Sequence, residues 1–299
     1  MKTLPRIVVI VGPTASGKSS AALRLAKKLG GEIVSADSRL LYRGMDIGTA
    51  KPTKAEQAEV PHHLIDVVAP SKTLTLSEYK RLALKAIRDI LKRGRLPIVV
   101  GGTGLYVRAL IENLAIPEVP PNPKFRSFLE KKGKDWILAR VKKLDPEYAE
   151  RIGPNARYAT RALEVIEATG KPFSAQQGIG PKLFDALVIG IDPGKEALKK
   201  RIAKRVASMF RSGLVDEARS LEKKYSEALP SMSGIGYSEL FPYFRDEVSL
   251  KEARSLIIRN TEQYAKRQMT WWRRIGGVLW VKSPEAAHKE ALIWLKQAK

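Results

Sequence analysis

The chain has 299 residues, which is enough for one large domain or two smaller ones. It carries 54 Lys and Arg against 31 Asp and Glu, and this net charge of +23 favours a polyanion such as nucleic acid over the alternative of a merely solvated basic surface. The absence of cysteine excludes disulfides and thiolate metal sites, and the three histidines form no metal-binding pattern. No apolar run approaches the ~20 residues of a membrane span or forms a signal peptide, so we expect a cytoplasmic protein without membrane contact.

The first predicted strand, residues 7–11, leads into a glycine-rich loop, GPTASGKSS, and then into a predicted helix at residues 19–29. The loop fits the pattern G-x-x-x-x-G-K-[ST] through Gly12, Gly17, Lys18 and Ser19. Its N–H groups and the helix N-terminus would bind phosphate, Lys18 would add positive charge, and the Ser19 hydroxyl suits a phosphate-bound Mg²⁺. The order of strand, loop and helix disfavours an ordinary glycine-rich turn. The motif predicts a phosphate site without identifying ATP as its ligand.

Two more predicted strands end beside candidate functional residues. EIVSADS predicts a strand that ends at Ala36 or Asp37, and LPIVVGG predicts one that leads into GGTGLY. Between them, Thr75 and Glu78 form a possible capping box for a helix that Gly94 would end. Strands that alternate with helices predict a parallel α/β sheet whose ligands lie at the carboxyl ends of the strands. We therefore expect the glycine-rich loop, Asp37 and GGTGLY to meet at one rim.

A proline-rich segment, IPEVPPNPKF, marks a change in composition and predicts a stiff linker. A helical pattern follows as far as Thr169, and the strand pattern resumes at ALVIGID. We predict a helical insertion at residues 116–183 between two parts, 1–115 and 184–299, of one core. The predicted fold is α/β, a P-loop NTPase-like parallel sheet with an inserted α-helical domain.

Two basic helices are predicted in the last third of the chain. In the first, Leu198, Ile202, Val206 and Met209 have the helical spacing of core residues. Arg201 and Arg205 lie one turn apart and could face either the phosphate rim or solvent. The second helix ends in Trp271 and Trp272, a pair more typical of a core than of a stacking platform, while the Lys and Arg around it are candidates for RNA contacts. The run VLWV predicts a last strand.

Eight blocks follow one another along the chain: GPTASGKS, SADSRLLYRGMDIGTAKP, HHLIDV, IVVGGTGLYVRAL, RALEVIEATGKP, GLVDEA, GIGYSE and QYAKRQMTWWRR. Together they span about Arg6 to Arg274 and closely resemble the tRNA dimethylallyltransferases, also called tRNA isopentenyltransferases. The resemblance implies transfer of a dimethylallyl group from dimethylallyl diphosphate to the N6 amine of the adenosine beside the tRNA anticodon, with release of diphosphate. It also implies Mg²⁺ as cofactor and the anticodon stem-loop as partner. Because such a site needs no second chain, we expect a monomer.

The resemblance assigns roles to individual residues. The diphosphate would be bound by Gly12, Pro13, Thr14, Ala15, Ser16, Gly17, Lys18 and Ser19, with Ser19 also on the metal. The catalytic residues would be Lys18, Asp37, Thr103 and Arg205, and Asp37 would accept the proton of the attacking amine. A helix cap or an outer partner of Mg²⁺ is the alternative for Asp37, and a helix cap is the alternative for Thr103.

The contacts to tRNA would fall on two stretches and two single residues. They are Asp37, Ser38, Arg39 and Leu40, then Thr103 and Arg126, and finally Arg157, Tyr158, Ala159, Thr160 and Arg161. The family pattern carries an arginine at the place of Tyr158, so we expect Arg157 to replace it.

Three other functions stay open at this point. A P-loop kinase that uses ATP on a small metabolite leaves the charge of +23 and the insertion unexplained. A prenyltransferase that acts on free adenine nucleotides would not need the basic insertion. An RNA-binding module without activity gives no reason for Lys18, Asp37 and Thr103 to converge.

Overall fold

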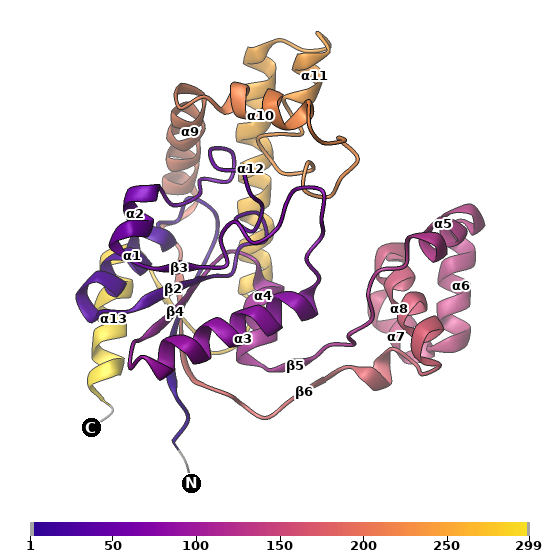
Figure 1. Cartoon of the computed structure of the whole chain (residues 1–299), viewed down its shortest axis with the longest axis horizontal. Helices are drawn as coiled ribbons and strands as arrows, with labels where there is room; N and C mark the ends of the chain where they lie inside the picture. The colour runs from indigo at the N-terminus through magenta and orange to yellow at the C-terminus, as the bar shows by residue number, and fades with distance from the viewer. Residues whose placement is uncertain (1–2, 298–299) are drawn as a thin grey trace. The chain divides into compact units, whose positions relative to one another are not determined.

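A six-stranded parallel sheet forms the centre of the larger part of the chain (Figure 1). The computed structural model describes residues 3–297. In sheet order the strands are β3 (His62–His63), β2 (Glu32–Ser35), β4 (Pro97–Val100), β1 (Arg6–Val11), β7 (Asp185–Ile191) and β8 (Val278–Val281). In the central strand, Val9 pairs with Val99 on one side and with Val188 on the other. The predicted α/β class with a parallel sheet is confirmed.

Helices on both faces explain why the inner strands are continuous apolar runs. On one face, α1 (Lys18–Leu29) and α13 (Pro284–Lys296) pack on Val8, Ile10 and neighbouring side chains of the sheet. The alternate residues of β1 point to the other face, where α3 (Leu76–Lys92) and α4 (Gly104–Ile111) lie. The capping box predicted at the start of α3 is confirmed, because the backbone N–H of Thr75 donates to the Glu78 carboxylate and the Glu78 N–H donates to the Thr75 hydroxyl.

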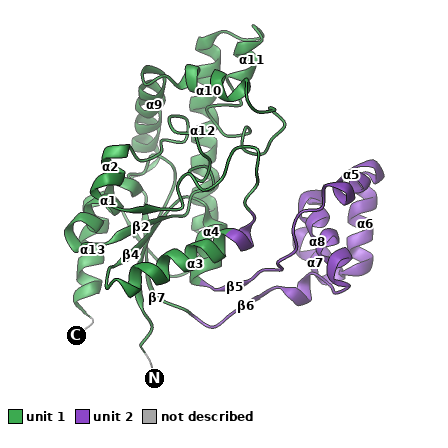
Figure 2. Ribbon diagram, viewed as in Figure 1, with its two compact units in different colours: residues 1–74, 79–111, 183–299 green, residues 75–78, 112–182 purple. Residues whose placement is uncertain are grey.

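The chain divides into two compact units (Figure 2). Unit 1 comprises residues 1–74, 79–111 and 183–299, and unit 2 comprises residues 75–78 and 112–182. The elements of unit 2 are β5 (Leu114–Ala115), α5 (Pro123–Lys132), α6 (Lys134–Leu144), α7 (Pro146–Ile152), α8 (Ala156–Thr169), the 3₁₀ helix η1 (Ser174–Gln176) and β6 (Gly178–Ile179). Its helices enclose their own core, in which Leu129 and Val141 are fully buried. The helical pattern predicted as far as Thr169 ends at that residue.

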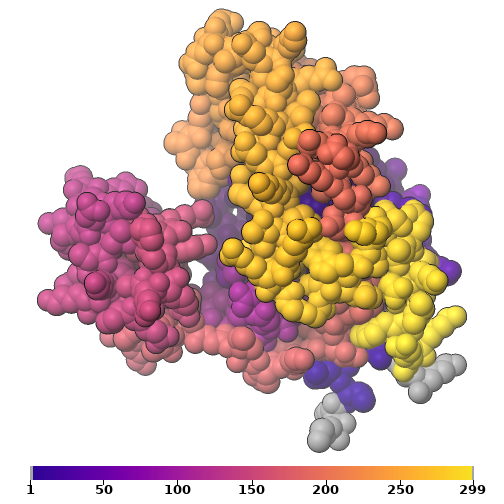
Figure 3. Space-filling view, turned by 180° about the vertical axis from the view of Figure 1, so that it is seen from behind, coloured from indigo at the N-terminus to yellow at the C-terminus, as the bar shows by residue number. Residues whose placement is uncertain are grey.

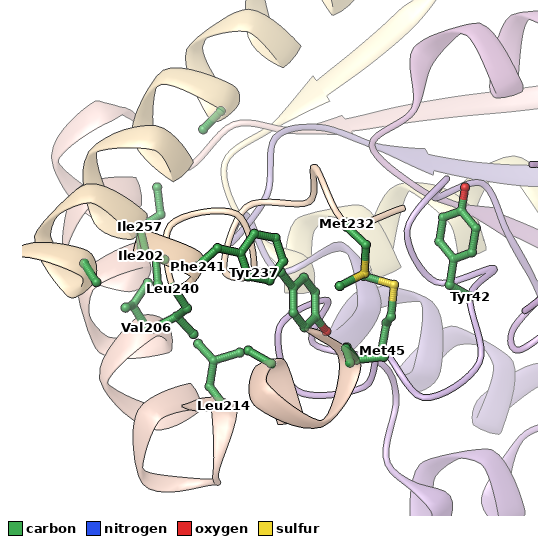
Figure 4. Close-up of a cluster of buried hydrophobic side chains, with 14 residues drawn as sticks. Tyr42, Met45, Ile202, Val206, Leu214, Met232, Tyr237, Leu240, Phe241 and Ile257 are labelled. Carbon is green, nitrogen blue, oxygen red and sulfur yellow. The ribbon is translucent and has the colours of Figure 1, made fainter. Parts of the chain in front are cut away.

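Unit 1 has a second core beyond the sheet (Figure 4). It is built from α9 (Lys195–Arg211), α10 (Leu214–Glu222), α11 (Phe241–Phe244) and α12 (Leu250–Trp272), whereas the short α2 (Lys54–Glu59) has no buried residue. Ile202 and Val206 are buried in this core, as their spacing predicted, and Met209 is partly buried. Trp272 is fully buried, which confirms a core position for that member of the Trp pair. The long α12 crosses the surface of unit 1 in the space-filling view (Figure 3).

Membrane-spanning helices were not expected. Within residues 3–297, every helix is too short or too polar to cross a bilayer.

Candidate functional site

The loop of residues 12–19, here called the phosphate loop, joins the central strand β1 to α1. Gly12 has φ = 136°, and a Cβ there would lie 2.6 Å from the carbonyl oxygen of Ile191, so this turn admits only glycine. The first N–H groups of α1 have no partner within the helix. The Ser16 hydroxyl is fully buried without a hydrogen-bond partner in the described part of the chain. The loop thus presents donors suited to an anion.

Lys18 is the first residue of α1 and turns back over the loop. Its Nζ donates to the carbonyl oxygen of Pro13 at 2.5 Å. Burial lowers the pKa of Lys18 to about 8; Asp37 opposes this shift and Arg205 adds to it. A partly buried ammonium beside a guanidinium is a place where a multiply charged anion restores the balance of charge.

Helix α9 brings two arginines to the phosphate loop. Arg201 donates to the carbonyl oxygen of Ser16 at 2.9 Å, and Arg205 donates to the Thr14 hydroxyl at 3.1 Å. A second nitrogen of Arg205 donates to the carbonyl oxygen of Thr49 at 3.3 Å. The alternative of a solvated basic face is therefore wrong for Arg205, whereas Arg201 is exposed and also contacts the loop. Arg205 lies beside the loop to which the resemblance assigns the diphosphate.

A cavity of about 470 Å³ opens beside the phosphate loop, within unit 1. Thr14, Lys18 and Ser19 line it from the loop, and Arg205 lines it from α9. The segment after β2 adds the predicted residues Asp37, Ser38, Arg39 and Leu40. The structure thus brings the predicted carboxylate and the predicted cations to one cavity.

The carboxylate of Asp37 is fixed by a local turn. Its Oδ1 accepts the backbone N–H of Arg39 at 2.9 Å. A turn follows Asp37, and the next helix along the chain is α2, so the helix-cap alternative for Asp37 is wrong. This hydrogen bond fixes Oδ1 and thereby orients the carboxylate, while Oδ2 takes no part in it.

Thr103 connects two strand ends. It precedes α4, and its hydroxyl accepts the backbone N–H of Ser38 at 3.1 Å. Its carbonyl oxygen accepts the N–H groups of Tyr106 and Val107 at the start of α4. The hydroxyl therefore supports the segment that carries Asp37, and the contribution of Thr103 to the helix start comes from its backbone.

Arg39 is held by the opposite side of the cavity. Its guanidinium donates to the carbonyl oxygens of Pro230 and Ser231 at 2.8 and 3.1 Å. The adjoining Ser233–Tyr237 stretch also lines the cavity. The structure therefore gives Arg39 a role in joining two walls, next to its predicted contact with tRNA.

The other residues predicted to contact tRNA lie in unit 2. Arg126 binds the buried carboxylate of Glu164 with two nitrogens at 2.7 and 2.8 Å, and Arg161 donates to the same carboxylate at 3.4 Å. Ala159 is fully buried. Arg157 and Tyr158 are exposed on the first turn of α8. Those two side chains are accessible to a partner.

Gln268 is a residue of the site that the sequence patterns did not single out. It lies on α12, is largely buried, and lines the cavity. Its Oε1 accepts the backbone N–H of Thr14 at 2.8 Å, and its Nε2 donates to the carbonyl oxygen of Gly102 at 3.0 Å. It therefore holds the phosphate loop against the end of β4. The block QYAKRQMTWWRR contains it, but periodicity cannot show which residue of a helix bridges two loops.

The oxygen atoms around the phosphate loop fit Mg²⁺. Ser19 and Asp37 both line the cavity, and within residues 3–297 no cluster of three or more acidic or His side chains forms a metal cage. Mg²⁺ in phosphate sites usually takes one or two protein oxygens together with phosphate oxygens. The donor set therefore suits an ion that is bound with its phosphate ligand.

The fold and the site define a class of protein. It is an α/β protein with a phosphate loop at the rim of a parallel sheet, whose cavity combines partly buried cations with a carboxylate. The family model described as IPP transferase matches residues 40–275, and the chain belongs to this family.

Relatives and solved structures agree with this assignment. The chain is 48% identical over 279 residues to a tRNA dimethylallyltransferase of Roseiflexus sp. (strain RS-1), with 91% of this chain and 92% of the relative covered. The tRNA isopentenylpyrophosphate transferase of Bacillus halodurans is 38% identical, has a TM-score of 0.72, and covers 98% of this chain and 97% of its own. A structure of a eukaryotic dimethylallyltransferase acting on tRNA is 31% identical, with a TM-score of 0.79 over 89% of this chain and 69% of that one.

The lowered pKa of Lys18 predicts that anion affinity depends on pH. Because Lys18 loses its proton above about pH 8, the affinity for inorganic diphosphate should fall by about tenfold between pH 7.5 and pH 9. Isothermal titration calorimetry on the wild type, Lys18→Met and Lys28→Met measures this. Lys28 is exposed at the other end of α1, so its variant should keep the wild-type curve, whereas the Lys18→Met curve shows the effect of titrating diphosphate itself. A wild-type curve that matches Lys18→Met would contradict the prediction.

Proposed function

We propose that the chain transfers a dimethylallyl group from dimethylallyl diphosphate to the N6 amine of the adenosine adjacent to the anticodon in tRNA, releasing diphosphate. Its membership of the IPP transferase family and the names of its relatives support this activity. The observation that carries it is the cavity, where a phosphate loop with two cations and a carboxylate lie together. The cations suit a diphosphate leaving group, and the carboxylate suits a weak amine nucleophile.

The phosphate loop would hold the leaving group. When the allylic C1–O bond breaks, its electron pair moves to the diphosphate, whose negative charge increases. Lys18 and Arg205 line the cavity beside the start of α1, and preorganised charge stabilisation of this kind is usually a large catalytic contribution. Bound Mg²⁺, for which Ser19 is the proposed ligand, would supply further charge neutralisation of the diphosphate.

Asp37 would accept the proton. The adenine amine is a poor nucleophile because its lone pair is delocalised into the ring. As the N6–C1 bond forms, the nitrogen becomes cationic and releases one proton, which Asp37 takes. The turn that holds Oδ1 of Asp37 keeps the carboxylate in place for this step. The sum is one N–C bond made, one C–O bond broken, and one proton moved to the carboxylate.

The RNA must open its anticodon loop, because the target base reaches a cavity only outside its stack. The net positive charge supports an RNA partner, but this charge is not concentrated in the insertion. Residues 112–182 hold 13 Lys and Arg and 9 Asp and Glu, which leaves 41 and 22 for the remaining residues. Most of the positive excess therefore belongs to unit 1. The exposed Arg157 and Tyr158 of unit 2 remain proposed contacts.

The remaining properties follow from this activity as proposals. We propose a monomer, since the cavity lies within unit 1. Because its substrate would be tRNA, we propose a cytoplasmic enzyme. ATP has no part in the proposed transfer, in contrast to the kinase alternative.

The transfer is tested with radiolabelled dimethylallyl diphosphate and Mg²⁺, supplied with unmodified tRNA, with AMP, or with ATP and metabolites. Label should enter tRNA alone, at the adenosine beside the anticodon. Label that enters only AMP would support the free-nucleotide prenyltransferase, and ATP turnover without transfer would support the kinase.

Replacement of Asp37 by Asn should separate chemistry from binding. The single-turnover transfer rate should fall by about 100-fold or more, because the amide cannot accept the proton. The affinity for inorganic diphosphate should change little, since the loop and its cations are intact. Asp216→Asn removes an exposed carboxylate on α10 and should leave both values unchanged. A near-native rate for Asp37→Asn would show that another group takes the proton.

A further inference from the structure

One carboxylate of α10 joins three segments that are far apart in the sequence. Glu217, from the block GLVDEA, accepts the backbone N–H groups of Asp46, Ile47 and Gly48 at 2.9 to 3.0 Å. It also accepts the hydroxyl of Tyr237 at 2.7 Å. Burial raises the pKa of Tyr237, so this hydroxyl keeps its proton and donates. Three backbone donors and a phenol on one carboxylate make a strong, directed set of hydrogen bonds.

The segments that Glu217 joins form a wall of the cavity. Gly48, Thr49 and Ala50 line it from one segment, and Ile235, Gly236 and Tyr237 line it from the other. They are tightly packed, because a Cβ on Gly48 would lie 2.5 Å from the Tyr237 ring. Figure 4 shows that ring between Phe241 and Met45. A small movement of either segment would therefore displace the wall.

The same wall also orients a cation of the site. Arg205 donates with one nitrogen to Thr14 in the phosphate loop and with the other to the carbonyl oxygen of Thr49. Thr49 follows directly after the residues whose N–H groups bind Glu217. Glu217 thus acts on Arg205 through the backbone of residues 46–49, without touching it.

Apolar side chains near Arg205 also line the cavity. Val206 is the next residue of α9, and Met209 lies one turn beyond Arg205; both line the cavity together with Ile235 and Ile257. An anion held by Arg205 would have this apolar surface beside it. Such an arrangement suits a molecule with a diphosphate at one end and a short hydrocarbon chain at the other.

We infer that Glu217 is a positioning residue for prenyl transfer, which sets the direction of Arg205 and the length of chain that the apolar end of the cavity accepts. The inference rests on the proposed function. It states that Glu217, a residue outside the reacting centre, controls how both ends of the prenyl diphosphate are positioned. Glutamine at position 217 would replace one accepting oxygen by an NH₂ group, which cannot accept a hydrogen bond. Some of the backbone N–H groups or the Tyr237 hydroxyl would then lose their acceptor.

The test compares the wild type with Glu217→Gln and with Asp216→Asn, an exposed neighbour on the same helix, as full chains. Two quantities are measured: the Kd for inorganic diphosphate, and the ratio of kcat/KM for geranyl diphosphate to that for dimethylallyl diphosphate on unmodified tRNA. Glu217→Gln should raise the Kd about tenfold and shift the ratio about tenfold toward the longer chain, because the wall is loosened. Asp216→Asn should change neither.

A general loss of stability would lower both kcat/KM values together and leave their ratio unchanged. Either quantity at its wild-type value in a folded Glu217→Gln protein, as judged by circular dichroism and thermal unfolding, overturns the proposal. Should that variant not fold, Glu217→Asp keeps the charge with a shorter reach and should shift the Kd at least about threefold, and a wild-type Kd overturns the proposal. The diphosphate measurement needs no transfer, so it decides this question even if the proposed transfer to tRNA fails.

Discussion

The direction of the six strands is the constraint on which the site depends. All of them run parallel, so their carboxyl ends lie at one rim. The central β1 is followed there by Gly12, β2 by Asp37, and β4 by Gly101. After β1, the chain forms β2, β3 and β4 on one side of it and then crosses to form β7 and β8 on the other side. The phosphate loop therefore lies where the strand order reverses.

Helices α9 and α12 add further residues to the site at this rim. Arg205 of α9 and Gln268 of α12 both contact Thr14, one through its hydroxyl and one through its backbone N–H. The two residues approach from separate helices that pack on each other. Burial at this junction also shifts the pKa of Lys18 downward. The surroundings of the loop therefore come from residues that follow Thr14 by 191 and 254 positions in the chain.

Local patterns predicted much of this structure. The phosphate loop, the strand before Asp37 and the capping box of α3 depend on neighbouring residues, so a short window contains the necessary information. The helical spacing of Ile202 and Val206 identified a core face for the same reason.

Contacts between distant segments were beyond such patterns. Periodicity allowed Arg201 and Arg205 to face either solvent or the loop, and only the packing of α9 decides. Gln268 and Glu217 bind backbone groups of other segments. Every residue has such groups, so the residue types in those segments do not predict the contacts. Arg126 was assigned to RNA, but its principal partner is the buried Glu164. The charge of Arg126 could be read from the sequence, whereas the burial of Glu164 beside it could not.

The central claim is that one cavity holds the diphosphate in its phosphate loop while Asp37 receives the proton of the incoming amine. A crystal structure of the chain with an unreactive dimethylallyl diphosphate analogue and an anticodon stem-loop tests it most directly. The claim predicts a diphosphate bonded to Lys18, Arg205 and the N–H groups of the phosphate loop, with the adenine N6 about 3 Å from the Asp37 carboxylate. A diphosphate bound away from the loop, or an adenine amine whose hydrogen-bond partner is another residue, would contradict it.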